Sequence, residues 1–98
     1  MKKEKDTLSK ILSDLPAEVR VRTKLSVAIA ERIEFLMLRK GLNKKQFAEA
    51  LGRRPSEISK WLSGEHNFTV SSLAKISAFF EAPVIEVSSL DESESDSR

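Results

Sequence analysis

Trp61 and His66, the only tryptophan and the only histidine of the chain, lie in the segment EISKWLSGEHNFT at residues 57–69. A histidine can act as a metal ligand or a general base, but both roles need partner side chains. The 98 residues include no cysteine, no tyrosine and three glycines, which excludes a zinc finger, a thiol nucleophile and a glycine-rich phosphate loop. No serine, histidine and acid recur at the spacing of a catalytic triad. We therefore expect a protein that is not an enzyme and needs no metal or cofactor.

The charge of the chain is distributed unevenly. The net charge is +2 overall, but it is +3 over residues 1–24, +4 over residues 25–64 and −5 over residues 65–98. A basic region followed by an acidic end favours a polyanionic partner. No apolar run reaches the ~18 residues of a membrane span, and no apolar segment follows the N-terminal lysines. We expect one small cytoplasmic domain with no membrane partner.

Short helices separated by glycine are predicted from about residue 26 to residue 80. The first, over about 26–40, ends at Gly41. Its apolar stripe has a period of 3.6 residues and consists of Leu25, Ile29, Ile33, Leu36 and Met37. The second begins after Asn43, which forms a capping box with Gln46, and ends at Gly52. Its inward face is predicted to consist of Phe47, Ala48 and Leu51.

Pro55 or Ser56 begins the third helix, because proline suits the first helical position, and Gly64 ends it. Its predicted inward residues are Ile58, Trp61 and Leu62. Trp61 is therefore interpreted mainly as a core anchor, with a partly exposed contact as the alternative. Thr69 caps a fourth helix that extends to about Phe80.

The two ends of the chain are less clearly patterned. Residues 1–24 form an N-terminal extension in which Leu8, Ile11, Leu12 and Leu15 make one stripe of a short amphipathic helix. Residues 19–23 fit either a strand or a helix that starts at Pro16. Residues 83–87 are a possible short strand, and residues 88–98 are predicted to be a disordered acidic tail. The N-terminal apolar stripe and the possible strand either extend the core or form an interface.

The two central helices are joined by a tight turn at Leu51–Arg54, which is a helix-turn-helix arrangement. The segment from Leu42 to Ile76 resembles the helix-turn-helix of the XRE/Cro family of bacterial and phage regulators. The resemblance as a whole covers residues 25 to about 82. The family pattern is matched at Leu42, Phe47, Ala48, Leu51, Gly52, Ile58, Ser59, Trp61 and Gly64. The resemblance implies an all-α, lambda-repressor-like bundle of four to five helices. Arg53 departs from the pattern, because many relatives have a small or apolar residue there.

The resemblance and the predicted helix faces together indicate a DNA interface. The outward face and N-terminus of the third helix are expected to read bases through Arg54, Pro55, Ser56, Glu57, Ser59 and Lys60. Glu57 has two possible roles, accepting from cytosine or orienting Arg54 or Lys60. The expected phosphate contacts are Lys44, Lys45, Gln46, Arg53, His66 and Asn67. A solvated charged face and a structural loop histidine are the simpler alternatives.

Two functions follow. The first is a sequence-specific regulator of transcription, a repressor that binds a palindromic operator in double-stranded DNA as a homodimer. The second rests on a resemblance of the GEHNFT continuation and the flanking segments to HigA-like antitoxins. It implies that the chain neutralises an RNA-cleaving protein toxin and represses its own operon.

Overall fold

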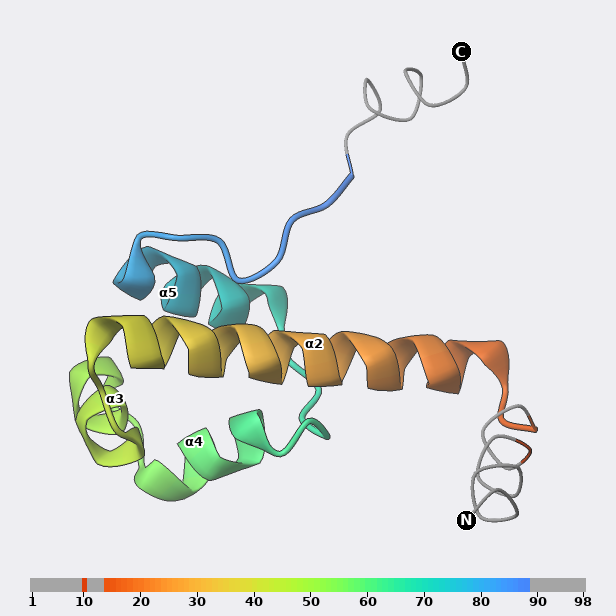
Figure 1. Cartoon of the computed structure of the whole chain (residues 1–98), viewed down its shortest axis with the longest axis horizontal. Helices are drawn as coiled ribbons and strands as arrows, with labels where there is room; N and C mark the ends of the chain where they lie inside the picture. Colours follow the sequence, from red (N-terminus) through yellow and green to blue (C-terminus); the bar gives the residue numbers. More distant parts are fainter. Residues whose placement is uncertain (1–9, 11–13, 89–98) are drawn as a thin grey trace. The chain divides into compact units, whose positions relative to one another are not determined.

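A computed structural model of the protein describes residue 10 and residues 14–88 (Figure 1). The helices are α2 (Ala17–Lys40), α3 (Lys44–Leu51), α4 (Pro55–Leu62) and α5 (Val70–Phe80). The described residues contain no strand, so the all-α fold class is confirmed. The chain divides between Phe68 and Thr69 into two compact units. Among the described residues, no helix combines the length and apolarity needed to cross a bilayer.

Helix α2 begins at Ala17, about nine residues earlier than the apolar period indicated, so the expected start near residue 26 is wrong. Pro16 precedes it with φ −54° and ψ 145°, and its carbonyl accepts hydrogen bonds from the amides of Val19 and Arg20. The segment 19–23 is therefore helical. Its valines alternate with charged residues as in a strand. This alternation is tolerated in a helix here because these turns are not buried on any one face. The stripe at Leu8, Ile11 and Leu12 lies outside the described residues.

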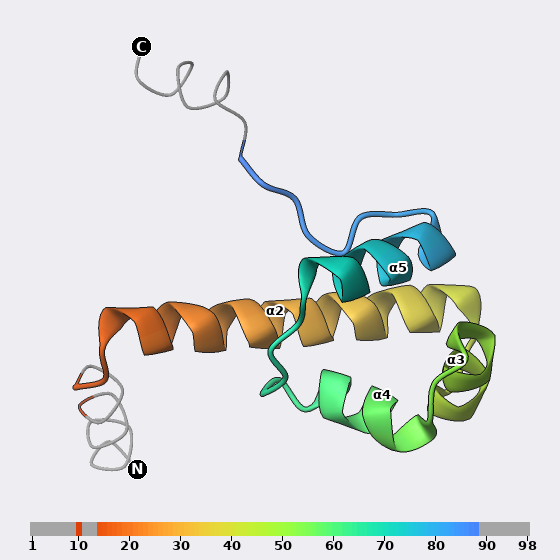
Figure 2. The ribbon, with the colours of Figure 1, turned by 180° about the vertical axis from the view of Figure 1, so that it is seen from behind.

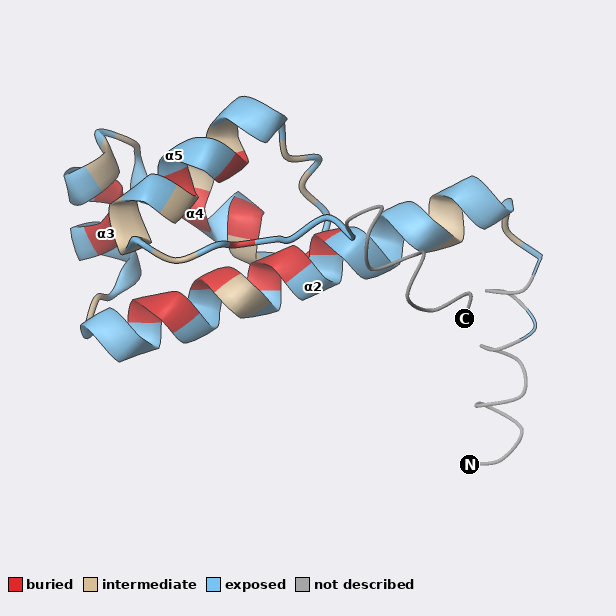
Figure 3. Ribbon diagram, turned by 90° about the horizontal axis from the view of Figure 1, so that it is seen from above, coloured by how far each residue is buried: buried red, intermediate tan, exposed pale blue. Residues whose placement is uncertain are grey.

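The buried face of α2 differs from the predicted stripe, because it also includes Ala30 and does not include Leu25. Ile33 is fully buried, as the period predicted, but Leu25 is 56% exposed and Ser26 is buried in its place. Figure 3 shows the buried residues of α2 confined to its middle and later turns, with the first turns exposed or half-buried. The period continues into turns that no other described part of this unit covers, so apolar spacing alone does not predict where burial ends.

The core of the first unit joins α2, α3 and α4. Phe47, Ile33 and Ile58 are fully buried, and Trp61 is 4% exposed. The Phe47 and Trp61 rings meet edge to face, with centroids 6.2 Å apart, a favoured aromatic geometry. Burying each large apolar side chain contributes about 1.5–3 kcal/mol. The interpretation of Trp61 as a core anchor is confirmed.

Gly64 follows α4 where the chain passes close to α2. Its φ is +83°, and a Cβ at this position would lie 3.2 Å from Cγ2 of Val27. A side chain here would be strained and crowded at once. The absence of a side chain at Gly64 thus allows the chain to turn at the end of α4 while it lies close to α2. Residues 65–68 follow from this turn.

The second unit consists of α5 and the segment that follows it. The Thr69 hydroxyl accepts a hydrogen bond from the amide of Ser72 at 3.0 Å, as the capping prediction requires. The possible strand at 83–87 is not confirmed, because the backbone there is irregular. The amide of Val84 donates to Oγ of Ser77 at 3.0 Å, a side-chain bond in place of a strand ladder. The tail beyond Ser88 lies outside the described residues.

Candidate nucleic-acid interface

The chain turns sharply between α3 and α4 (Figure 2), and backbone hydrogen bonds close this turn. Gly52 is left-handed at φ +70°, its amide donates to Glu49, and the amide of Arg53 donates to the carbonyl of Ala48 at 2.8 Å. This pair of bonds is a Schellman motif, which ends a helix and turns the chain sharply. Two helices of eight residues are too short to be stable alone, so the turn and the shared core fix their geometry.

Helix α4 has one buried face and one exposed face. Ile58 and Trp61 are buried, whereas the predicted base-reading residues lie mainly on the outside. The exposed ones are Arg54, Pro55, Ser56, Ser59 and Lys60. Glu57 alone of the predicted set is partly buried. The outward face therefore presents a guanidinium, two hydroxyls, an ammonium and a proline ring. The opposite face of the helix is packed in the core.

Glu57 is bound by its own chain. Its Oε1 accepts from the amide of Arg54 at 3.3 Å, and its Oε2 accepts from the guanidinium of Arg53 at 3.2 Å. The Arg54 amide is the main cause that lowers the pKa of this carboxyl, with the Arg53 guanidinium adding to the effect. Both oxygens thus stabilise the start of α4. The side chain that Glu57 holds is that of Arg53, whereas its contact with Arg54 is to the backbone amide, and its role toward DNA stays a prediction.

Arg53 is the position at which the sequence departs from the pattern that it resembles. Its guanidinium carbon lies 5.8 Å from the centroid of the Trp61 ring, within cation–π range. The ion pair with Glu57 holds it there. Arg53 therefore covers the tryptophan as an apolar residue would, and its contacts are to the protein. The i, i+4 spacing of Arg53 and Glu57 signals the pair, but nothing in the sequence reveals the contact with Trp61.

The N-terminus of α3 carries the predicted capping box. Oδ1 of Asn43 accepts from the amide of Gln46 at 2.8 Å, and Oε1 of Gln46 accepts from the amide of Asn43 at 2.9 Å. The Gln46 side chain is thus engaged in the cap. By helix geometry, the amides of Lys44 and Lys45 have no intrahelical acceptor. Both lysine side chains are exposed, so this end offers two ammonium groups and two outward amides.

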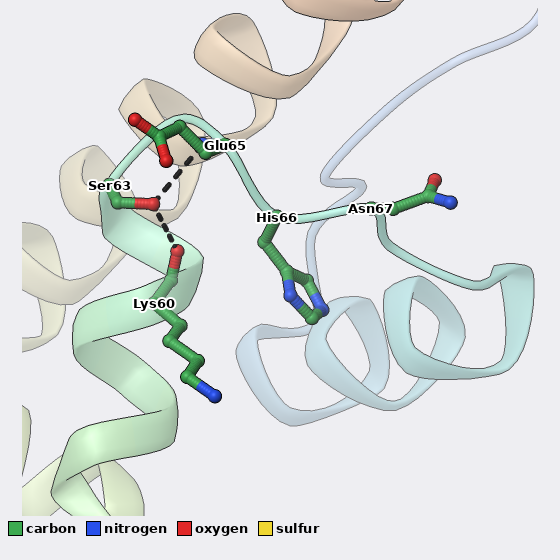
Figure 4. A pocket seen from close by; sticks show the side chains of 5 residues that line it. All are labelled: Lys60, Ser63, Glu65, His66 and Asn67. Carbon is green, nitrogen blue, oxygen red and sulfur yellow. Dashed lines mark hydrogen bonds between the residues drawn. The ribbon is translucent and has the colours of Figure 1, made fainter.

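The loop after α4 forms a surface hollow of about 310 Å³ (Figure 4). Oγ of Ser63 donates to the carbonyl of Lys60 at 2.6 Å and accepts from the amide of Glu65 at 3.1 Å, which shapes the loop. His66 is half-buried, its ring edge to face with Phe68 at 4.6 Å. The side chains of Lys60 and His66 project to the same side of the loop, whereas Asn67 points away. Ser63 and Glu65 complete the hollow, and no motif singled them out.

The comparison with protein families agrees with this geometry. A helix-turn-helix family model matches residues 33–87, more than half of the chain. The chain belongs to this family, which places it among XRE-type DNA-binding regulators of transcription. Neither the curated proteins nor the solved structures include a match. The narrower likeness to HigA-like antitoxins, with its toxin partner, stays a prediction.

Proposed function

We propose that this protein is a repressor that binds a palindromic operator as a homodimer. The observation that carries the proposal is the division of α4, with Ile58 and Trp61 buried and a polar face exposed. A rigidly backed helix of this kind fits the major groove, where base edges can be distinguished. Promoter occlusion is the mechanism by which a bound dimer represses.

The base contacts are assigned to the exposed side chains of α4. Arg54 lies at the start of the helix, where its guanidinium can bind O6 and N7 of a guanine. Ser56 and Ser59 can donate to or accept from base edges, and Pro55 offers an apolar contact to a thymine methyl group. Lys60, one turn further along, borders the surface hollow and reaches either a base or a phosphate.

The phosphate contacts are assigned to both sides of the reading helix. Lys44 and Lys45 bring their ammonium groups and the outward amides of α3 to one strand. His66 and Asn67 lie on the loop beyond α4 and are assigned to the backbone on the other side. Gln46 and Arg53 are engaged by the protein in the free state, so we assign them supporting roles. Neutralised phosphates release counterions, and affinity therefore falls with salt.

The homodimer doubles the number of base pairs that are read. Two copies related by a two-fold axis place their reading helices on half-sites about one helical turn, ~34 Å, apart. The operator should therefore be a palindrome with that spacing. A monomer that reads one half-site would give a short motif without symmetry.

The experiment that tests this function is selection of bound duplexes from a random pool at near-physiological salt, followed by sequencing. We expect an enriched palindrome with the wild-type protein and its loss with the variant Arg54→Ala/Lys60→Ala. Ser71→Ala, an exposed position on α5, is the control and should select the same sequence. Circular dichroism must show that all variants keep their helices. Absence of any enriched sequence with a folded wild-type protein would exclude sequence-specific reading.

A further inference from the structure

Helix α2 carries a second stripe that does not face the core. Val21, Leu25 and Phe35 are 55%, 56% and 47% exposed. They recur with other residues at alternating spacings of four and three, in the order Val21, Leu25, Ala28, Arg32, Phe35 and Arg39. At 100° per residue, this stripe lies about 120° around the helix from Ile33. Alternating spacings of three and four are those of a helix that pairs with another helix. We refer to these six residues as the α2 seam.

We propose that the α2 seam binds the α2 seam of a second copy, with the two helices antiparallel. The inference deepens the homodimer of the proposed function and names its interface. In the proposed register, Leu25 lies opposite the partner's Ala28, and Ala28 opposite the partner's Leu25. Arg32 then lies opposite the partner's Val21, where its aliphatic stem covers the valine and its charged end reaches water.

The charges beside the seam are complementary in this register. Lys24 and Glu31 immediately precede the seam residues Leu25 and Arg32, and both are exposed. Residues in this position line the edge of an antiparallel helix pair and meet one another across it. The register places Lys24 beside the partner's Glu31, and Glu31 beside the partner's Lys24. Each dimer thus gains two ion pairs between a lysine and a glutamate.

The ends of the seam agree with the same register. Phe35 lies between two arginines, with the guanidinium carbons of Arg32 and Arg39 at 5.5 Å and 5.7 Å from its ring centroid. The register brings the partner's Glu18, in the first turn of its α2, opposite Phe35 and between the two arginines. Glu18 is exposed in the single chain. A cationic end of one helix therefore meets an acidic end of the other.

Other arrangements of the two helices bring like charges together. A parallel pair places Arg32 against the partner's Arg32 and Arg39 against the partner's Arg39. Shifting the antiparallel pair by seven residues in one direction places Glu31 beside the partner's Glu31. The opposite shift places Lys24 beside the partner's Lys24. Like charges across an interface suppress the wrong pairing, so the sequence of α2 favours one register.

The first test is a charge exchange measured on the full chain without DNA. Sedimentation equilibrium should show a dimer for the wild-type protein. Lys24→Glu and Glu31→Lys should each raise the dissociation constant by about tenfold or more, and the double variant should return it to near the wild-type value, because opposite charges again face each other. Glu34→Lys, an exposed charge reversal on the same helix but away from the seam, should leave the constant unchanged.

The second test uses the absence of cysteine from the chain. A mixture of Leu25→Cys and Ala28→Cys proteins should form a mixed disulfide dimer, because the two positions face each other. Val21→Cys alone should remain uncrosslinked, since the two copies of this residue lie about 16 Å apart along the helix axis in the proposed register. Efficient crosslinking of Val21→Cys would mean a parallel pair and would overturn the register.

The two proposals fail separately. A monomeric wild-type protein, or a dimer unaffected by Lys24→Glu and Glu31→Lys, would overturn the seam even if a palindrome is selected. Conversely, a dimer that follows the charge exchange but selects no sequence would leave the seam standing and overturn the operator function. Far-ultraviolet circular dichroism of each variant separates loss of pairing from loss of the helix.

Discussion

Helices α3 and α4 have the same length of eight residues but begin in different ways. The start of α3 is a neutral capping box between Asn43 and Gln46. The start of α4 is ionic, because the Glu57 carboxylate receives the Arg54 amide and the Arg53 guanidinium. In both arrangements, the side chain at the third helical position accepts a hydrogen bond from the amide of the residue that precedes the helix. The difference is that the α4 start depends on a charge, so its stability should depend on pH and on salt concentration.

The second difference concerns what each start supports. The cap of α3 lies between exposed residues, whereas the ion pair of α4 is built on the buried Trp61 ring through Arg53. The start of the proposed reading helix is thereby coupled to the core. A change in the core should disturb α4 directly, while a change in the α3 cap should stay local.

The largest effect is expected from Trp61→Ala. This change removes the edge-to-face contact with Phe47 and the surface beneath Arg53 together, and we expect the free energy of unfolding to fall by about 3–5 kcal/mol. Denaturant titration followed by circular dichroism measures it. Leu38→Ala, at a position that is 73% exposed on α2, is the matched control and should have little effect. A similar loss for both variants would contradict the anchoring role of Trp61.

An intermediate effect is expected from Asn43→Ala. The variant removes the acceptor for the Gln46 amide, and loss of an N-cap costs about 0.5–2 kcal/mol. Because the cap is neutral, the loss should be the same at pH 7 and at pH 4. Asn43→Asp restores an acceptor and should recover most of the stability at pH 7. A loss for Asn43→Ala that varies strongly with pH would show that charges also take part at this helix start.

The smallest effect is expected from Glu57→Gln, which gives α4 the neutral acceptor that α3 already has. The pKa of Glu57 is lowered in the folded protein, so its ionised form contributes stability above its unfolded pKa. That contribution is lost as the pH falls through the folded pKa. Wild type should therefore exceed Glu57→Gln in stability at neutral pH, and the two should converge in acid. The denaturation midpoints of both proteins across this range provide the measurement.

Salt gives an independent check on the same variant. Exposed ion pairs are screened as ionic strength rises, so the difference between wild type and Glu57→Gln should also shrink at high salt. Glu49→Gln, an exposed carboxylate on α3, serves as the control and should show neither trend. A constant difference at every pH and salt concentration would mean that the negative charge of Glu57 does not contribute to the stability of the α4 start.

Local signals in the sequence determined the starts and ends of the short helices. Asn43 with Gln46, the left-handed Gly52, Pro55 and Thr69 each act within a few residues, so their consequences could be predicted without knowing the fold. The inward pairs Phe47 with Ala48 and Ile58 with Trp61 were also predictable, because a helix-turn-helix has one buried side. The exposed face of α4 follows from the same geometry, and its reading of bases stays a prediction.

Only the tertiary structure decided which parts of a regular pattern are buried and which side chains meet across elements. The apolar period of α2 continues through Leu25, yet burial begins at Ser26, because the first turns extend beyond the core of their unit. Val84 is buried without joining a strand, since its amide donates a hydrogen bond to the hydroxyl of Ser77. Arg53, Glu57 and Trp61 form one cluster through contacts that depend on how the turn brings the three side chains together. Local sequence fixes backbone conformation through short-range sterics and hydrogen bonds, whereas burial depends on what packs against each surface.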